Sequence, residues 1–297
     1  MKYLVVLLWP AVMVVIFSVA FLLTRRARQS IPAAARASGS RPQAQPGSHE
    51  APPGKFAGSP WLLGAGQMLG LIVIGALIAF GVMALLGLLV VHHGLTIDQP
   101  IYNWLVFHQV SSWAAIMNRL TKIGNSWTCW AAAVAAAVCM AVTWRTKRWL
   151  PPIVLTAVIV VDHYTTLALR HTFERLGPPD SPLGTYPSGG CDRVILFYGL
   201  IAYLLWREFS GQRKTALWAG AVVAALGFNE AYSRVYLGLH WFTDAASGLL
   251  YGSLLLAAFI IAVRLVAGPA VVRQGGGDRI RAAVLDPVTS GAGGAGS

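Results

Sequence analysis

The chain has 297 residues, of which 56% are apolar and only 11% are charged, and its formal net charge is +12. An ordinary soluble domain carries about 25% charged residues, so this composition excludes that class of protein. The apolar residues form long blocks that lack the polar faces of a soluble helical core, and such blocks are typical of membrane-spanning helices. The sequence therefore predicts an all-α protein that crosses a membrane several times.

The two ends of the chain differ from its middle in composition. The first apolar run, residues 3–23, is followed at once by three arginines, whereas a cleaved signal peptide carries its basic residues before the run. We therefore expect residues 1–24 to be an uncleaved transmembrane anchor. Residues 25–60 are rich in Pro, Ala, Gly and Ser, and residues 268–297 are rich in Gly, so both segments are expected to be disordered, the first as a linker and the second as a tail.

The remaining domain, residues 61–267, contains six further apolar runs, each of which predicts a membrane-spanning helix. These runs cover approximately residues 62–91, 127–144, 149–169, 194–206, 216–231 and 243–263. The fourth run is too short to cross a bilayer unless its helix begins near Ser188. That start would place the sequence Ser-Gly-Gly at a helix N-terminus.

The basic residues indicate an orientation. If the domain crosses the membrane six times, the linker, the tail and two of the short connections between spans lie on the same side of the membrane. These segments contain most of the 23 Lys and Arg residues. Because basic loops stay in the cytoplasm, the linker and tail are expected to be cytoplasmic, and loops 92–126, 170–190 and 232–242 extracytoplasmic, in a plasma (inner) membrane. The positive charge thus reports topology and predicts no nucleic-acid partner. The three cysteines lack metal-type spacing, and no metal site or cofactor is expected.

The last of these outer loops carries a possible nucleophile. It reads SRVYLGLHWFTD, and its His240 and Asp244 would share one face if the segment were helical. A carboxylate bonded to one imidazole nitrogen leaves the other nitrogen as a nucleophile or a general base. Arg234, beside an apolar span, would add a positive charge. Taken alone, the His–Asp pair could equally be a surface interaction at a helix start.

The middle outer loop carries groups suited to an anion. Arg170 ends one apolar run and Arg175 follows five residues later, before the stretch TYPSGGCDR. The glycines Gly189 and Gly190 would let backbone N–H groups approach an anion at a helix N-terminus, and the hydroxyl of Ser188 adds a donor. Alone, PSGG could be only a turn. Arginines, an anion cradle and an oriented histidine on one face together indicate phosphoryl transfer.

At these residues the chain resembles the type 2 phosphatidic acid phosphatase (lipid phosphate phosphatase, haloperoxidase-like) family, over about residues 62–265. The third motif of that family, Ser-Arg-x5-His-x3-Asp, is complete in Ser233, Arg234, His240 and Asp244. The resemblance implies a six-helix membrane core with His240 as the nucleophile that forms a phosphohistidine and Asp244 as its partner. It also implies that Arg170, Arg234, Ser188 and the backbone of Gly189 bind phosphate, and the glycine cradle adds Gly190 to this set.

Two departures from the family's motifs concern the same site. Gly177 stands where the first motif has an arginine, and we expect Arg175 to replace it as a phosphate ligand. Gly190 replaces the second-motif histidine that protonates the leaving group in the family. Asp192 is the nearest substitute acid, although a helix start favours its ionised form. The other two candidates near the loops are Glu174 and His171.

The predicted function is therefore hydrolysis of a phosphate monoester or diphosphate of a membrane lipid, either polyprenyl diphosphate or a phosphatidic acid-like lipid. Without the motif histidine, a diphosphate is the easier substrate, because phosphate is a less basic leaving group than an alkoxide. The alternatives are a pseudoenzyme that binds phospholipid head groups and, less favoured, a transporter. The sequence makes no prediction about oligomeric state. If Gly190 only removes an acid, Gly190→His should raise turnover of a monoester.

Overall fold

The computed structural model describes residues 60–144, 147–179, 181 and 185–268, and the regular secondary structure within these ranges is helical throughout. The expected anchor, residues 1–24, lies outside the described residues. So do the expected linker and tail, apart from the single residues Pro60 and Gly268 at their inner boundaries. The 61–267 domain is therefore the part of the prediction that can be compared with the structure.

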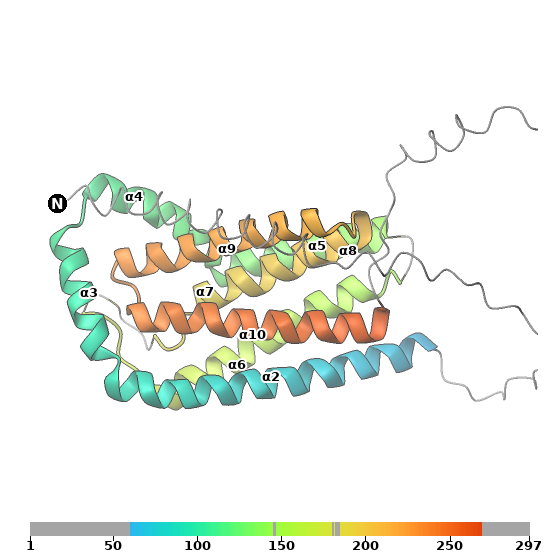
Figure 1. Ribbon diagram of the computed structural model, residues 1–297, viewed down its shortest axis with the longest axis horizontal. Coiled ribbons are helices and arrows are strands. Elements are labelled where there is room, and N and C mark those ends of the chain that lie inside the picture. The colour runs from blue at the N-terminus through green and yellow to red at the C-terminus, as the bar shows by residue number, and fades with distance from the viewer. Residues whose placement is uncertain (1–59, 145–146, 180, 182–184, 269–297) are drawn as a thin grey trace, which may run out of the picture.

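Each of the six predicted runs lies in a helix of the structure. These helices are α2 (Pro60–His93), α5 (Ser126–Thr143), α6 (Leu150–Phe173), the joined series from Gly189 to Phe209, α9 (Arg213–Tyr236) and α10 (Phe242–Ala267) (Figure 1). Five of them are long and apolar enough to cross a membrane, and α9 is not among these five. Helix α9 carries several charged residues, among them Arg213, Lys214, Glu230 and Arg234. The chain is thus a multi-pass, all-helical membrane protein whose fifth predicted span is more polar than the others.

The fourth span begins where its length requires. Helix α7 (Gly189–Arg193) follows Ser188 directly and continues through a π-helical turn, η3 (Val194–Tyr198), into α8 (Gly199–Phe209). Together they form a helical segment of 21 residues, which is enough to cross the hydrocarbon core of a bilayer. The Ser-Gly-Gly sequence therefore lies at the start of a membrane-spanning helix, as the sequence predicts.

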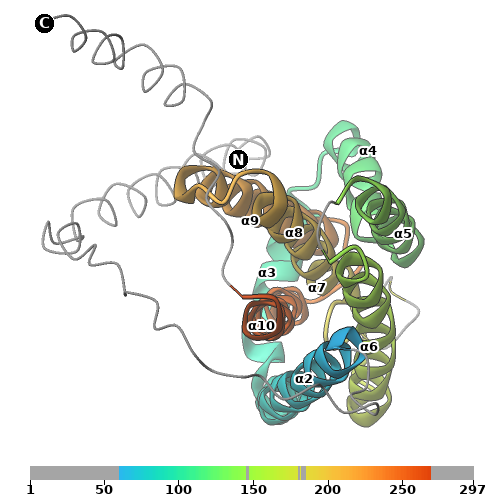
Figure 2. The same cartoon turned by 90° about the vertical axis from the view of Figure 1, so that its right-hand side faces the viewer.

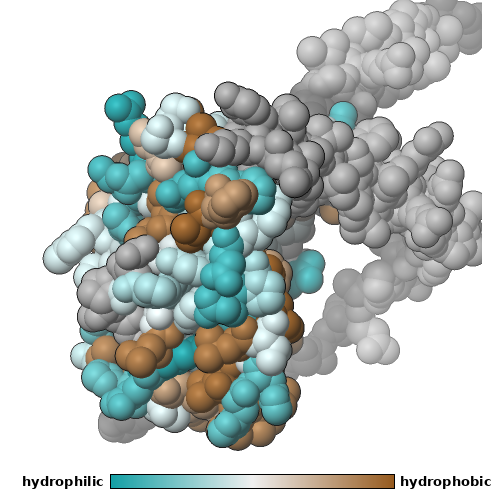
Figure 3. Space-filling view, turned by 90° about the vertical axis from the view of Figure 1, so that its left-hand side faces the viewer, coloured by the Kyte–Doolittle hydropathy of each residue, from teal (hydrophilic) through white to brown (hydrophobic). Residues whose placement is uncertain are grey.

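The segment between the first two spans is not only a loop. It forms α3 (Leu95–Phe107), α4 (Ser111–Leu120) and the short 3-10 turn η2 (Thr121–Gly124). Figure 1 shows α3 and α4 at the left-hand end of the bundle, where the α6–α7 and α9–α10 loops also lie. Figure 3 looks onto this end and shows hydrophilic and hydrophobic side chains intermixed. These helices escape sequence prediction because they are too short and too mixed in polarity to form an apolar run.

Helix α10 positions the Ser-Gly-Gly segment. It packs along α2 and against α7, and Figure 2 shows it in end view between these elements. A Cβ on Gly248 would collide with the carbonyl oxygen of Ser188, and one on Gly252 with the backbone of Asp192. Small residues four apart let two membrane helices approach closely. Gly248 and Gly252 therefore allow the start of α7 to lie directly against α10.

Candidate functional site

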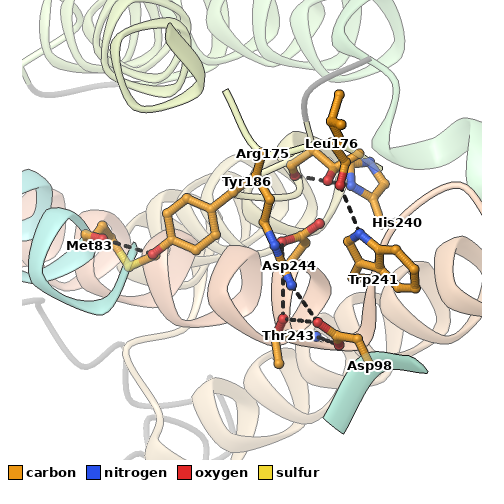
Figure 4. Close-up of polar contacts among 10 residues, drawn as sticks. Met83, Asp98, Arg175, Leu176, Tyr186, His240, Trp241, Thr243 and Asp244 are labelled. Atoms are coloured by element: carbon orange, nitrogen blue, oxygen red, sulfur yellow. Dashed lines mark hydrogen bonds and ion pairs between the residues drawn. The ribbon is translucent and has the colours of Figure 1, made fainter. Parts of the chain in front are cut away.

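The two loops that carry the candidate residues lie side by side in the structure. The backbone N–H of Ser188 donates to the carbonyl oxygen of Asp244 at 3.0 Å. Nδ1 of His240 lies 3.2 Å from the carbonyl oxygen of Thr185, and Nε1 of Trp241 donates to the carbonyl oxygen of Leu176 at 2.9 Å (Figure 4). The hydrogen bonds between α6–α7 and α9–α10 thus bring together residues more than fifty positions apart.

Three guanidinium groups converge on the two glycines at the start of α7. A Cβ placed on Gly189 would lie 2.7 Å from Nη2 of Arg170 and 3.0 Å from both Nη1 and Nη2 of Arg193. A Cβ placed on Gly190 would lie 2.6 Å from Nη2 of Arg234. A side chain at either position would meet a guanidinium that would have to shift, so the two glycines let these arginines approach the backbone. Arg170, Arg193 and Arg234 together form what we call the arginine cluster.

The polar groups beside this cluster suit an oxyanion. Ser188 is fully buried at the N-terminal end of α7. Oγ of Ser188 and Nε of Arg170 are both buried and have no hydrogen-bond partner among the described residues. Donors of this kind, next to positively charged side chains at a helix start, are the groups that bind phosphate oxygens in proteins. The geometry can therefore hold an anion with several oxygens.

His240 lies in the short connection before α10 and is 8% exposed. Its Nδ1 faces the carbonyl oxygen of Thr185, which can only accept a hydrogen bond, so Nδ1 carries the proton and Nε2 has the free electron pair. Burial, together with the positive charges of Arg234 and Arg170, lowers the pKa of His240 to about 3. The ring is thus neutral at physiological pH, with Nε2 able to act as a nucleophile.

This lowered pKa predicts how His240 reacts with diethyl pyrocarbonate, which attacks neutral imidazole. Between pH 7 and pH 5 the rate of modification of an ordinary histidine falls about 25-fold, because its pKa is near 6.5. The rate for His240, measured by mass spectrometry of its peptide, is expected to change little over the same range. N-acetylhistidine in the same solution is the control. A parallel fall for both would show that the folded protein does not keep His240 neutral.

The partner of His240 differs from the one the sequence predicts. The expected hydrogen bond from His240 to Asp244 is not formed: Nδ1 of His240 lies against the carbonyl oxygen of Thr185, and Asp244 accepts from Nη1 of Arg175. The physical reason is that His240 lies before the first turn of α10, so the two residues are not on one helical face. The tautomer of His240 is therefore fixed by a backbone carbonyl and not by the carboxylate that the sequence predicts.

Arg175 does not belong to the arginine cluster. Its Nη2 donates to Oδ2 of Asp98 at 2.6 Å, and its Nη1 binds both Asp244 and Oγ1 of Thr243 (Figure 4). Asp98 also accepts from the backbone N–H and the hydroxyl of Thr243, and so caps the start of α10. Both terminal nitrogens of Arg175 thus face carboxylates and Thr243 rather than the arginine cluster. The expectation that Arg175 binds phosphate gains no support from this position.

The acidic residues lie behind the cluster. Oδ2 of Asp192, the expected substitute acid, accepts from the hydroxyl of Thr166 on α6 at 3.1 Å in the bundle interior. Glu230 accepts from Nε of Arg234 at 2.7 Å. The other two candidate acids, His171 and Glu174, are exposed near the C-terminal end of α6. The structure thus shows no hydrogen bond from these acids to His240 among the described residues.

Four residues of this site were missed from the sequence. Gly248 and Gly252 position α7, and their four-residue spacing is a signal that could have been used. Arg193 lies one helical turn after Gly189, which is also readable from the sequence once α7 is placed. Asp98 could not have been found, because its partners are 77 and 145 residues away.

Comparisons with known proteins agree with this geometry. Residues 126–266 match the model of the PAP2 superfamily. A segment of 59 residues is 38% identical to the putative undecaprenyl-diphosphatase YbjG of Escherichia coli (strain K12), covering 20% of this chain and 26% of that protein. A segment of 118 residues is 30% identical to phosphatidylglycerophosphatase B of Bacillus subtilis (strain 168), covering 37% and 56%. The matches therefore span about a quarter and just over half of these relatives.

A solved structure shows the same fold. It is the crystal structure of the first transmembrane PAP2 type phosphatidylglycerolphosphate phosphatase from Bacillus subtilis, with a TM-score of 0.56 and 22% sequence identity. The alignment covers 62% of this chain and 94% of that one. The helical arrangement around the site is thus an arrangement known from another membrane protein.

Proposed function

We propose that this chain is a membrane lipid phosphatase, because residues 126–266 match the model of the PAP2 superfamily. Its substrate would be a phosphate monoester or diphosphate of a lipid. The observation that carries the proposal is the neutral ring of His240 beside three arginines that converge on Gly189 and Gly190. The curated relatives are named for action on an undecaprenyl diphosphate and on a phosphatidylglycerophosphate, which are substrates of these two kinds.

In the proposed reaction, Nε2 of His240 attacks the terminal phosphorus atom of the substrate. A bond forms between nitrogen and phosphorus as the bond from phosphorus to the leaving oxygen breaks, which gives a phosphohistidine. Water then attacks the phosphorus, releases inorganic phosphate and restores the neutral ring. Arg170, Arg234, Ser188 and the backbone of Gly189 would hold the non-bridging oxygens as negative charge builds on them.

Asp244 would act indirectly in this scheme. It binds Arg175, which also binds Asp98, and the backbone carbonyl of Asp244 holds Ser188. The proposed role of Asp244 is therefore to keep the His240 loop and the Ser188 segment in register. The Thr185 carbonyl stabilises the proton on Nδ1 while Nε2 carries the phosphoryl group.

The proposed substrate class is a diphosphate. No side chain extends from Gly190 to protonate a leaving oxygen, and the nearest acids are bound elsewhere or exposed. A general acid contributes about 10²–10⁴-fold, and that contribution matters least for a weakly basic leaving group. A lipid phosphate leaving from a diphosphate is such a group, whereas the alkoxide leaving from phosphatidic acid is not.

The proposed orientation puts the site on the extracytoplasmic side. The opposite end of the bundle carries exposed basic residues at the α5–α6 and α8–α9 connections and near the end of α10, namely Lys147, Arg148, Arg213, Lys214 and Arg264. Basic residues near span ends favour the cytoplasm. Substrate would then reach His240 from the outer leaflet of the plasma membrane.

The proposal is tested with purified protein in detergent micelles. Phosphate release is measured from a polyprenyl diphosphate and from phosphatidic acid, beside a His240→Ala variant that removes the nucleophile. We expect the wild-type protein, but not His240→Ala, to release phosphate, and to release it faster from the diphosphate than from phosphatidic acid. Rapid quenching of the wild-type reaction should trap an acid-labile phosphohistidine. Release from both lipids no greater than that of His240→Ala would reject the enzyme and favour the pseudoenzyme that only binds head groups.

A further inference from the structure

The site lacks one arginine that the resemblance implies, because position 177 is glycine. A Cβ at Gly177 would lie 2.7 Å from Cγ2 of Thr185 and 2.8 Å from the side chain of Ser181, so a longer residue does not fit there without movement of the loop. Arg175, the nearest candidate in sequence, is held by Asp98 and Asp244. The replacement must therefore come from another element.

We propose that Arg193 is the third phosphate-binding arginine of this site and takes the place of the missing first-motif arginine. The inference rests on the proposed function, since it assigns a further ligand to the same phosphate. Arg193 lies on α7, four residues after Gly189, and helical side chains point back towards the helix N-terminus. Its guanidinium is thereby carried to the Ser-Gly-Gly segment.

The geometry of Arg193 matches that of Arg170. Both its Nη atoms lie 3.0 Å from the Cβ position of Gly189, and Nη2 of Arg170 lies 2.7 Å from the same point. Two guanidinium groups that meet at one point repel each other. An anion bound between them attracts both groups and offsets this repulsion. Arg170 is already implied as a phosphate ligand by its position in the first motif. Arg193 would reach the same anion from α7, whereas Arg170 reaches it from α6.

Arg193 has a hydrogen bond at Nε and a long ion pair at Nη1, and neither terminal nitrogen is in a hydrogen bond within the described residues. Its Nε donates to the carbonyl oxygen of Gly124 at 3.2 Å, which fixes the direction of the side chain. Its Nη1 lies 3.9 Å from Oδ2 of Asp162, beyond hydrogen-bond distance. Arg175, in contrast, has both Nη atoms in hydrogen bonds. The side chain of Arg193 is 12% exposed and is thus oriented but still open to a ligand.

The test measures binding of inorganic orthovanadate, a phosphate analogue, by titration calorimetry of the full-length protein in detergent micelles. We expect Arg193→Gln to weaken binding about 10- to 100-fold, the effect of losing a charge-assisted hydrogen bond. Arg207→Gln is the matched control, because Arg207 binds the carbonyl oxygens of Ala267 and Gly268 at the other end of the bundle. It should bind orthovanadate as the wild type does.

A structural role for Arg193 is excluded with a second variant. Asp162→Asn removes the carboxylate behind Arg193 and should leave orthovanadate affinity unchanged or raise it. Equal losses in Arg193→Gln and Asp162→Asn, or full affinity in Arg193→Gln, would overturn the proposal. The binding measurement does not require turnover. If the wild-type protein binds orthovanadate but releases no phosphate from either lipid, the proposed function is rejected, and the binding data still decide the role of Arg193.

Discussion

Replacement of Arg175 by methionine is expected to lower the free energy of unfolding by about 3–5 kcal/mol, the typical effect of removing one partner from a buried ion pair. Arg175 lies between Asp98 and Asp244, and both carboxylates are fully buried. Without the guanidinium, two negative charges would remain in a site from which water is largely excluded. These contacts join α3, the α6–α7 loop and α10, so we expect the loss to destabilise the end of the bundle that carries the site.

This loss is measured by titrating purified protein with sodium dodecyl sulfate in mixed micelles and following the helical circular dichroism signal. Lys214→Met, at an exposed position on α9, is the control for loss of a positive charge. The double variant Arg175→Met/Asp98→Asn should recover part of the stability, because one unpaired charge is removed. If Arg175→Met and the control both unfold at the same detergent fraction as the wild type, the ion pairs of Arg175 with Asp98 and Asp244 contribute nothing measurable to stability.

Introduction of a side chain at Gly190 is expected to lower phosphatase turnover by about 10²–10³-fold, the effect of removing one donor that stabilises developing negative charge. A Cβ at this position would lie 2.6–2.7 Å from the guanidinium of Arg234. That guanidinium cannot move aside freely, since Nε is bound to Glu230 at 2.7 Å and Nη2 to Asn125 at 3.2 Å. Gly190→His would therefore displace Arg234, the proposed phosphate ligand, rather than supply a missing acid.

The measurement compares Gly190→Ala and Gly190→His with the wild type by initial rates of phosphate release from a polyprenyl diphosphate and from phosphatidic acid. Gly220→Ala on α9 is the matched control, because no atom lies within 4 Å of a Cβ placed there. The sequence alone predicts the opposite result, a gain of monoester turnover in Gly190→His. A gain would show that Arg234 moves easily and that the position still accepts a proton donor.

Much of the architecture is determined by the sequence itself. The apolar runs locate the long helical segments of the described residues, and the short fourth run places the start of α7 beside Ser188 because a span needs a minimum length. The alternation of spans also places both functional loops at one end of the bundle. These features depend on the composition of contiguous segments and on the thickness of a bilayer, which need no knowledge of distant contacts.

The chemistry of the site was decided only by the tertiary structure. Whether an arginine binds phosphate or a carboxylate depends on which residues the packing brings near it: Asp98 comes to Arg175 from 77 positions away, and Gly124 to Arg193 from 69. Sequence spacing likewise assigned His240 to Asp244, whereas α10 begins only at Phe242, and Nδ1 of His240 lies against the carbonyl oxygen of Thr185 instead. Local patterns specify helices, but ion pairs between helices are selected by geometry that the chain acquires only when it folds.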